Sequence, residues 1–325
     1  MKKILIILVG GTICCEENEK GNLEVGSHGG SALINGFKNS SSEYKDSAEF
    51  VCSENLFILS ENMTVNNWNR IIKTYKDCTE NAAFDGVIFA HGTDTLGFSA
   101  ALFAQLLCNE KWPVFFVSAQ KPLSDPLSNG HANFKCAVEC ILKGVKNGVW
   151  VAYKNISDNT MYIHNGAALR QCENYSDDFL SFNMQKEDNF KFESVNSKTD
   201  IPLDIPLENN VLLIESYVGI DYSAYDLSRF KAVLHTTYHS GTACAEKNEN
   251  GEYTADSFLY LIDACKKSKV DLYLCPAENK KGTYQTVDTI FSHGDVNFLY
   301  GYTKETAYAK LLIAYSVFEN EKDRK

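Results

Sequence analysis

The 325-residue sequence has no long hydrophobic run, no CxxC pair and no concentrated basic patch, and each absence excludes a class of protein. No stretch approaches the ~18 consecutive apolar residues that a membrane-spanning helix needs, so we expect no membrane partner. The formal net charge of −11 disfavours nucleic acids and anionic lipids as partners. The eleven cysteines are scattered, which predicts buried thiols in a reducing cytoplasm rather than a disulfide framework or a metal site.

The composition, with 44% hydrophobic and 22% charged residues, is typical of a globular protein. A chain of this length predicts about two domains, because single cores stop growing at ~250 to 300 residues. Near the N-terminus, Met1-Lys2-Lys3 precedes the apolar run Ile4–Val9. That run is shorter than the ~7 to 15 residues of a secretory signal, so it predicts a buried strand.

Short apolar runs alternate with helical patterns along the chain, which is typical of parallel βαβ units. We expect a larger N-terminal α/β domain, residues 1–190, built on a parallel sheet with helices on both faces. A polar linker, 191–210, then leads to a smaller C-terminal α/β domain, 211–325. Residues 14–47 lack periodicity and predict a long loop, which at that length is usually a functional lid.

The predicted strands are Ile4–Val9, Leu56–Leu59, Val87–Ala90, Val114–Val117, Val149–Tyr153, Val211–Ile214, Lys231–His235 and Val270–Cys275. The predicted helices are Val65–Tyr75, Leu96–Leu107, His131–Lys146, Ala255–Lys267 and Glu305–Phe318.

Hydroxyl and carboxylate side chains follow the first three predicted strands. They lie in Gly10-Gly11-Thr12, in Ser60-Glu61 and in Gly92-Thr93-Asp94-Thr95. Each segment alone could be only a tight turn or a helix cap. Because ligands of open parallel sheets bind at the carboxyl ends of the strands, the three together predict one site. A threonine hydroxyl needs activation to act as a nucleophile, and a neighbouring carboxylate can hold a substrate ammonium group.

Two of these segments resemble the signatures of the bacterial L-asparaginases, in the style of the cytoplasmic type I enzymes. Val9-Gly10-Gly11-Thr12-Ile13 matches their GGTI box, and Ala90-His91-Gly92-Thr93-Asp94-Thr95-Leu96 matches their HGTDT box. The likeness is strong through residues 1–150. Further matching segments are Leu59–Thr64 with Trp68, Ser118–Pro122, Ser128-Asn129-Gly130 with Asn133, and, past the linker, Tyr238-His239-Ser240-Gly241.

The resemblance implies an amidohydrolase that releases ammonia from L-asparagine, giving L-aspartate, with no metal or organic cofactor. It implies that Thr12 is the nucleophile or activates a water, and that Thr93 and Asp94 act with a lysine in activation and substrate binding. The resemblance also implies that the protein acts on a small-molecule amino-acid amide and forms a homodimer or homotetramer. The implied substrate-binding residues are Gly11, Ser60, Glu61, Gly92 and Ala119.

Two positions depart from the family pattern. The tyrosine of the family lid matches Asn22, which follows Lys20-Gly21. The family lysine precedes a segment that matches Asp177-Asp178-Phe179, and this register places Arg170 at the lysine position. A guanidinium has a pKa above ~12 and cannot act as a base, so activity on asparagine should be weak and Arg170→Lys should raise it.

Two other functions stay open at this point. The same fold could act on glutamine or another amide, or it could be a catalytically weakened amino-acid-binding protein that keeps Ser60, Glu61 and Asp94. A dinucleotide-binding dehydrogenase is disfavoured, because no G-x-G-x-x-G follows a strand. We expect His91 to be a structural turn residue rather than a general base.

Overall fold

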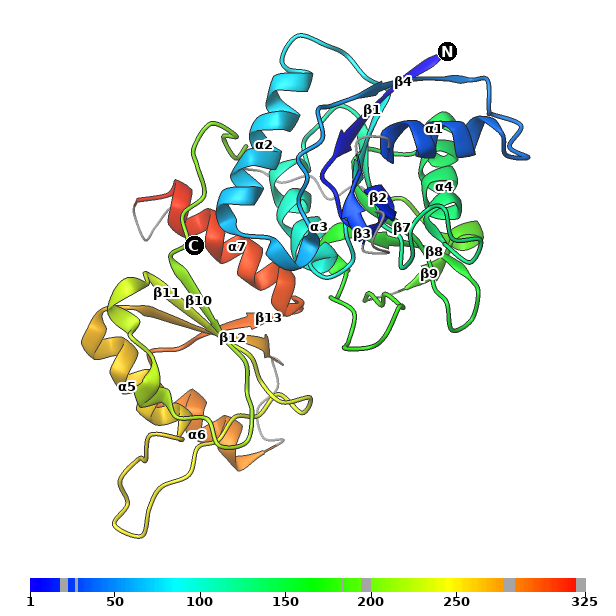
Figure 1. Ribbon diagram of the computed structural model, residues 1–325. Helices are drawn as coiled ribbons and strands as arrows, with labels where there is room; N and C mark the ends of the chain where they lie inside the picture. Colours follow the sequence, from blue (N-terminus) through cyan, green and yellow to red (C-terminus); the bar gives the residue numbers. More distant parts are fainter. Residues whose placement is uncertain (18–22, 27–28, 183, 194–199, 278–283, 320–325) are drawn as a thin grey trace. The chain divides into compact units, whose positions relative to one another are not determined.

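The computed structural model describes residues 1–17, 23–26, 29–182, 184–193, 200–277 and 284–319 (Figure 1). The chain forms two compact units, Met1–Pro206 and Leu207–Lys325. Both are α/β, as predicted. Asn22 and the preceding Lys20-Gly21 lie outside the described residues. Every helix in the described ranges is too short or too polar to span a lipid bilayer.

A seven-stranded sheet forms the centre of the first unit. Its spatial order is β4 (Ala48–Cys52), β1 (Lys2–Leu8), β5 (Gly86–Ala90), β6 (Pro113–Val117), β7 (Gly148–Lys154), β8 (Met161–Asn165) and β9 (Gln185–Lys186). The strands from β4 to β7 are parallel, but β8 and β9 are antiparallel, so the predicted parallel sheet is mixed at this edge. Residues 155–160 join β7 to β8 and are too few for the crossover that a parallel pair needs.

Helices cover both faces of this sheet, as predicted. On one face lie α1 (Gly29–Lys38) and α4 (Gly130–Leu142), and on the other α2 (Val65–Thr79) and α3 (Leu96–Leu106) (Figure 1). Alternate strand residues point to opposite faces. Ile88 therefore joins Phe37 and Phe134 in the α1/α4 layer, whereas Phe89 lies 5.9 Å from Tyr75 and 5.0 Å from Phe103, ring centre to ring centre, in the α2/α3 layer. Burial on both faces explains why these strands are continuous apolar runs.

The segment between β1 and α2 differs from the prediction. Instead of one loop over 14–47, it contains the antiparallel pair β2 (Cys15–Glu17) and β3 (Leu23–Val25) and the helix α1, which buries Leu33 and Phe37. The predicted strand Leu56–Leu59 is also wrong: the strand is β4, and Ile58 forms only an isolated bridge with Gly10. As a partly exposed edge strand, β4 has no apolar run that could reveal it.

The second unit is a four-stranded parallel sheet in the order β10 (Val211–Ile214), β11 (Ala232–His235), β12 (Asp271–Ala277) and β13 (Asn297–Tyr300). The helices described in this second unit are α5 (Phe258–Ser268), α6 (Gln285–His293) and α7 (Lys304–Val317). The prediction omits α6 and β13, whose residues are nearly all exposed or half-exposed. Short 3-10 helices complete the chain: η1 (Thr12–Cys14), η2 (Ser60–Asn62), η3 (Gly166–Ala168), η4 (Glu187–Asn189), η5 (Tyr222–Ala224) and η6 (Leu227–Arg229).

Candidate functional site

The turns that follow β1 and β5 touch through their backbones. The two strands are neighbours, with Leu8 paired to Ala90. A Cβ atom added to Gly11 would lie 2.2 Å from the Cα and 2.4 Å from the nitrogen of Gly92, and Gly11 has a φ of +73°. Only glycine fits such a contact and such a backbone angle. The contact places Thr12 and Thr93, the next residue of each turn, on adjacent turns at the same edge of the sheet.

Ser60 joins a third segment to this pair of turns. It opens η2, is buried, and donates its hydroxyl proton to Asp94 Oδ2 at 2.7 Å. The Ser60 hydroxyl oxygen accepts the backbone N–H of Asp94 at 3.2 Å, and Thr95 Oγ1 donates to the Ser60 carbonyl at 3.0 Å. A Cβ atom on Gly92 would lie 2.4 Å from Ser60 Oγ, so this packing also requires glycine. The predicted residues Gly11, Ser60, Gly92 and Asp94 therefore do come together.

Glu61 lies beside the first turn. The Cys15 thiol donates to the carbonyl oxygen of Gly11 at 3.2 Å. Burial raises the pKa of this thiol, and the negative charge of Glu61 raises it further. The Glu61 side chain itself is exposed, so its carboxylate is accessible to a ligand.

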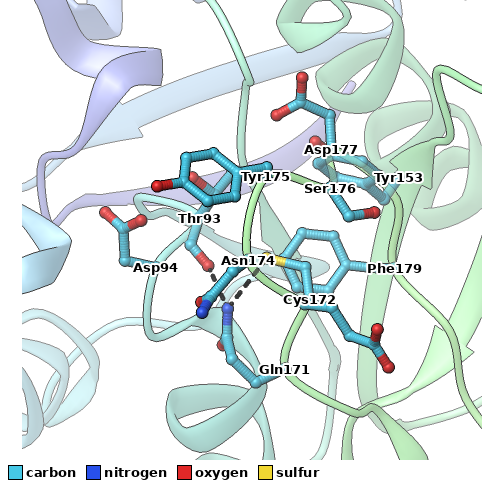
Figure 2. Close-up of a pocket in the computed structure, with 11 residues that line it drawn as sticks. Thr93, Asp94, Tyr153, Gln171, Cys172, Asn174, Tyr175, Ser176, Asp177 and Phe179 are labelled. Carbon is cyan, nitrogen blue, oxygen red and sulfur yellow. Dashed lines mark hydrogen bonds between the residues drawn. The ribbon is translucent and has the colours of Figure 1, made fainter.

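A cavity of about 590 Å³ opens beside Thr93 and Asp94 (Figure 2). Three carboxylates line it, from Asp94, Glu173 and Asp177, and none of its lining residues is Lys, Arg or His. Its electrostatic field therefore favours a cationic group. The full lining is Thr93, Asp94, Tyr153, Gln171, Cys172, Glu173, Asn174, Tyr175, Ser176, Asp177 and Phe179.

Most of the predicted site residues do not line this cavity. Thr93 and Asp94 do, while Gly11, Thr12, Ser60, Glu61, Gly92 and Ala119 do not. Ala119 is completely buried and packs beneath the first residue of α4, where a Cβ atom on Gly130 would lie 2.8 Å from its own Cβ. Its predicted role beside the scissile amide stays a prediction.

The assignment of Arg170 to the family's lysine position stays a prediction. The Arg170 side chain is half exposed, pairs with Glu173 at 3.8 Å and does not line the cavity. Gln171 points the other way and donates from Nε2 to the Thr93 carbonyl oxygen at 2.9 Å. The Arg170 N–H bonds to the Leu180 carbonyl in an extended segment, where successive side chains alternate in direction. The sequence offers no signal that chooses between the two registers.

His91 behaves as the structural residue that we predicted. It is fully buried, and its Nδ1 donates to the Gly92 carbonyl oxygen at 2.7 Å. Burial lowers the pKa of His91 to about 4, although the Gly92 carbonyl and Asp94 act in the opposite direction. Such an imidazole is neutral at physiological pH and braces the turn. Within the described part of the chain, no group of three or more His, Cys, Asp or Glu residues could hold a metal ion.

Comparisons with a family model and with solved structures relate this chain to the same family, the asparaginases. The family model described as "Asparaginase, N-terminal" matches residues 3–201. A glutamyl-tRNA(Gln) amidotransferase subunit from Archaeoglobus fulgidus is 30% identical over 175 residues, which cover 50% of this chain and 41% of that protein. The chain thus spans less than half the length of this relative.

Two solved structures share the fold. The thermostable L-asparaginase from Thermococcus kodakarensis gives a TM-score of 0.74 at 18% identity, and L-asparaginase I from Vibrio cholerae gives 0.73 at 21% identity. Each comparison covers 99% of this chain and 95% of the solved one. At these identities the likeness shows the fold alone.

Acid should destabilise the protein through His91. Its pKa is about 4 in the folded chain and near 6.5 when unfolded, so between these values the unfolded chain binds more protons. The free energy of unfolding should fall by about 2 to 3 kcal/mol from this group as the pH drops from about 7.5 to 4.5. Urea unfolding of His91→Gln should show a correspondingly shallower pH dependence. The exposed His239, changed to Gln, is the control and should leave the parent's slope unaltered; equal slopes for all three proteins would contradict the prediction.

Gly92→Ala should break the connection between Ser60 and Asp94. The new Cβ would force Ser60 away, at a cost of about 1 to 3 kcal/mol in unfolding free energy, as for other overpacked sites. The double variant Gly92→Ala/Ser60→Gly removes the atoms that clash and should recover part of this stability. Urea denaturation measures both effects, and a double variant no more stable than Gly92→Ala would be inconsistent with this packing.

Proposed function

This chain belongs to the asparaginase family of amidohydrolases, and we propose that it hydrolyses the side-chain amide of a small amino-acid amide, with L-asparagine as the principal substrate. The observation that supports the proposal is the Gly11–Gly92 contact, which joins the turns that carry Thr12 and Thr93 at the carboxyl ends of adjacent strands. Ligands of open parallel sheets bind at this edge.

Thr12 is the nucleophile in the proposed reaction. Its hydroxyl oxygen adds to the amide carbonyl carbon, the C–N bond breaks, and the hydroxyl proton passes to the departing nitrogen, which leaves as ammonia. Water then cleaves the acyl ester on Thr12 and returns a proton to it, releasing L-aspartate. A water that Thr12 activates directly would give the same products. We assign the proton transfers to Thr93 and Asp94.

The polar groups around the two turns supply the binding interactions. Asp94 accepts the Ser60 hydroxyl at Oδ2, which leaves Oδ1 for the ammonium group of a substrate. The exposed carboxylate of Glu61 can bind the same group. The close approach of Gly11 and Gly92 brings backbone rather than side chains to the ligand.

A larger or more cationic amide is the second candidate substrate. The cavity beside Thr93 is lined by three carboxylates and, at about 590 Å³, has the size of pockets that hold ligands larger than asparagine. The relative named as an amidotransferase subunit also supports an amide other than free asparagine.

A third candidate, a catalytically weakened amino-acid-binding protein, is supported by Gln171. A neutral amide, rather than a lysine ammonium group, lies against the Thr93 carbonyl. An amide neither accepts nor releases a proton at physiological pH, so the proton transfers depend on Asp94 and the hydroxyl groups alone.

For assembly and location, we propose a cytoplasmic homodimer or homotetramer with a small-molecule substrate as its ligand. All eleven cysteines are free thiols, which supports a reducing compartment. Closed symmetric assemblies are the usual form of homo-oligomers.

Removing either threonine hydroxyl should strongly reduce turnover. Thr12→Ala and Thr93→Ala should each lower ammonia release from L-asparagine by at least about 100-fold, because nucleophilic and proton-transfer steps contribute about that much. Thr79→Ala is the matched control, since its hydroxyl donates to the Tyr75 and Lys76 carbonyls within α2. A coupled ammonia assay on asparagine, glutamine and asparaginamide measures the rates.

The same panel separates the three candidates. Fastest release from asparagine supports the principal proposal. Fastest release from the larger glutamine or from the carboxylate-blocked asparaginamide supports the second candidate. Calorimetric binding of L-aspartate with no release from any amide would replace the hydrolase with a binding protein. A Thr12→Ala variant as active as Thr79→Ala would end the assignment of Thr12 as nucleophile.

A further inference from the structure

Helix α3 is not capped by its own N-cap residue. Thr95 occupies the N-cap position but makes no side-chain cap, because its hydroxyl donates to the Ser60 carbonyl instead. The N–H groups of a first helical turn need partners from elsewhere. One of them, the N–H of Gly97, donates to Gln171 Oε1 at 2.9 Å. Gln171 therefore caps α3 from a segment 74 residues further along the chain.

The other end of the same amide holds the turn that precedes the helix. Gln171 Nε2 donates to the Thr93 carbonyl oxygen at 2.9 Å and to Cys172 Sγ at 3.2 Å, as Figure 2 shows. A primary amide carries a donor and an acceptor on one planar group, so it can satisfy a carbonyl and an N–H four residues apart at once. Neither a lysine nor an ionised glutamate can do both.

The backbone of this segment also packs directly on the helix. A Cβ atom on Gly97 would lie 2.7 Å from the nitrogen and 2.9 Å from the Cα of Gln171. Because Gly97 has no side chain, the Gln171 side-chain amide comes close enough to form its hydrogen bonds to the Gly97 N–H and to the Thr93 carbonyl. The contact between Gln171 and the start of α3 is fixed by packing and by hydrogen bonds together.

We propose that Gln171 is a positioning residue for Thr93: it holds the Thr93 turn and the first turn of α3 in one fixed arrangement and ties both to the wall of the cavity. The proposal rests on the proposed function, since it concerns how Thr93 is presented to the substrate. Gln171 takes no part in proton transfer. Misplacing a reacting group by about 1 Å can cost 10²-fold in rate, so this tether should matter for turnover more than for folding.

A second glutamine of the same unit provides a matched comparison. Gln120 Oε1 accepts the Asn129 N–H at 3.0 Å, and its Nε2 donates to the Leu127 carbonyl at 2.9 Å. It makes the same pair of bonds within a turn that does not line the cavity. Losing either pair should lower the melting temperature by a similar amount.

The first experiment compares Gln171→Leu with Gln120→Leu. We expect similar losses of melting temperature, but kcat on asparagine should fall at least about tenfold only in Gln171→Leu, with KM changed by less than about threefold. Hydrogen exchange at the Gly97 amide should accelerate in Gln171→Leu and not in Gln120→Leu. Equal kcat values in the two variants, or an unchanged Gly97 exchange rate, would overturn the proposal.

The second experiment uses Gln171→Glu. It tests whether turnover depends on the hydrogen bond from residue 171 to the Thr93 carbonyl, and not only on the hydrogen bond to Gly97. An ionised glutamate accepts from Gly97 but cannot donate to the Thr93 carbonyl, whereas a protonated one can do both. Relative to the parent, its kcat should therefore recover in part as the pH is lowered from about 7 to 4.5, toward the ordinary pKa of a glutamate carboxyl at about 4.3. A constant ratio of the two rates across this range would contradict the proposal.

Failure of the proposed hydrolase function can be told apart from failure of the positioning role of Gln171. If the parent releases ammonia from no amide, hydrolysis is excluded, and the same three variants are then compared by calorimetric binding of L-aspartate and by Gly97 exchange. Affinities that differ by less than about threefold, with faster Gly97 exchange in Gln171→Leu than in Gln120→Leu, would retain the positioning role. Equal Gly97 exchange rates in the two variants would reject it.

Discussion

The candidate site depends on one contact, the backbone of Gly11 against the backbone of Gly92. Side chains at either position would separate the turns after β1 and β5. The contact lets Ser60 reach Asp94, because the same lack of a Cβ on Gly92 makes room for the Ser60 hydroxyl. Burial of His91 under this turn, with a lowered pKa, removes a titrating cation from beneath it. The chemistry thus rests on the close packing of two strand ends rather than on any single functional group.

The charged side chains that line the cavity are all carboxylates. Asp94, Glu173 and Asp177 line the cavity, and the cation nearest in sequence, Arg170, turns outward to pair with Glu173. The residue that does contact Thr93 is the neutral Gln171. A site of this kind attracts an ammonium group by its field and holds its threonine by hydrogen bonds. In the proposed function, binding and positioning are therefore assigned to different residues.

The sequence was most informative where strands are buried on both faces. The run Val87–Ala90, the polar turn and the apolar helix after it match β5, the His91–Thr95 segment and α3 closely. It was least informative at the sheet edge, because β4 is partly exposed and α1 begins with two glycines and a serine. The choice between Arg170 and Gln171 depends on the direction of alternating side chains, which only the pairing with Leu180 fixes. Of the site, the residue types at the strand ends could be predicted, but the cavity wall over 171–179 could not.

The amide tether of Gln171 has an evolutionary consequence. In the genetic code, each glutamine codon becomes a lysine codon or a glutamate codon by one base substitution. The group beside the Thr93 carbonyl is thus a single mutational step from either sign of charge. The packing of the backbone on Gly97 involves no side chain of residue 171 and would accompany any such substitution. This position therefore offers a short route by which related sequences can exchange a fixed hydrogen-bond geometry for a titrating group.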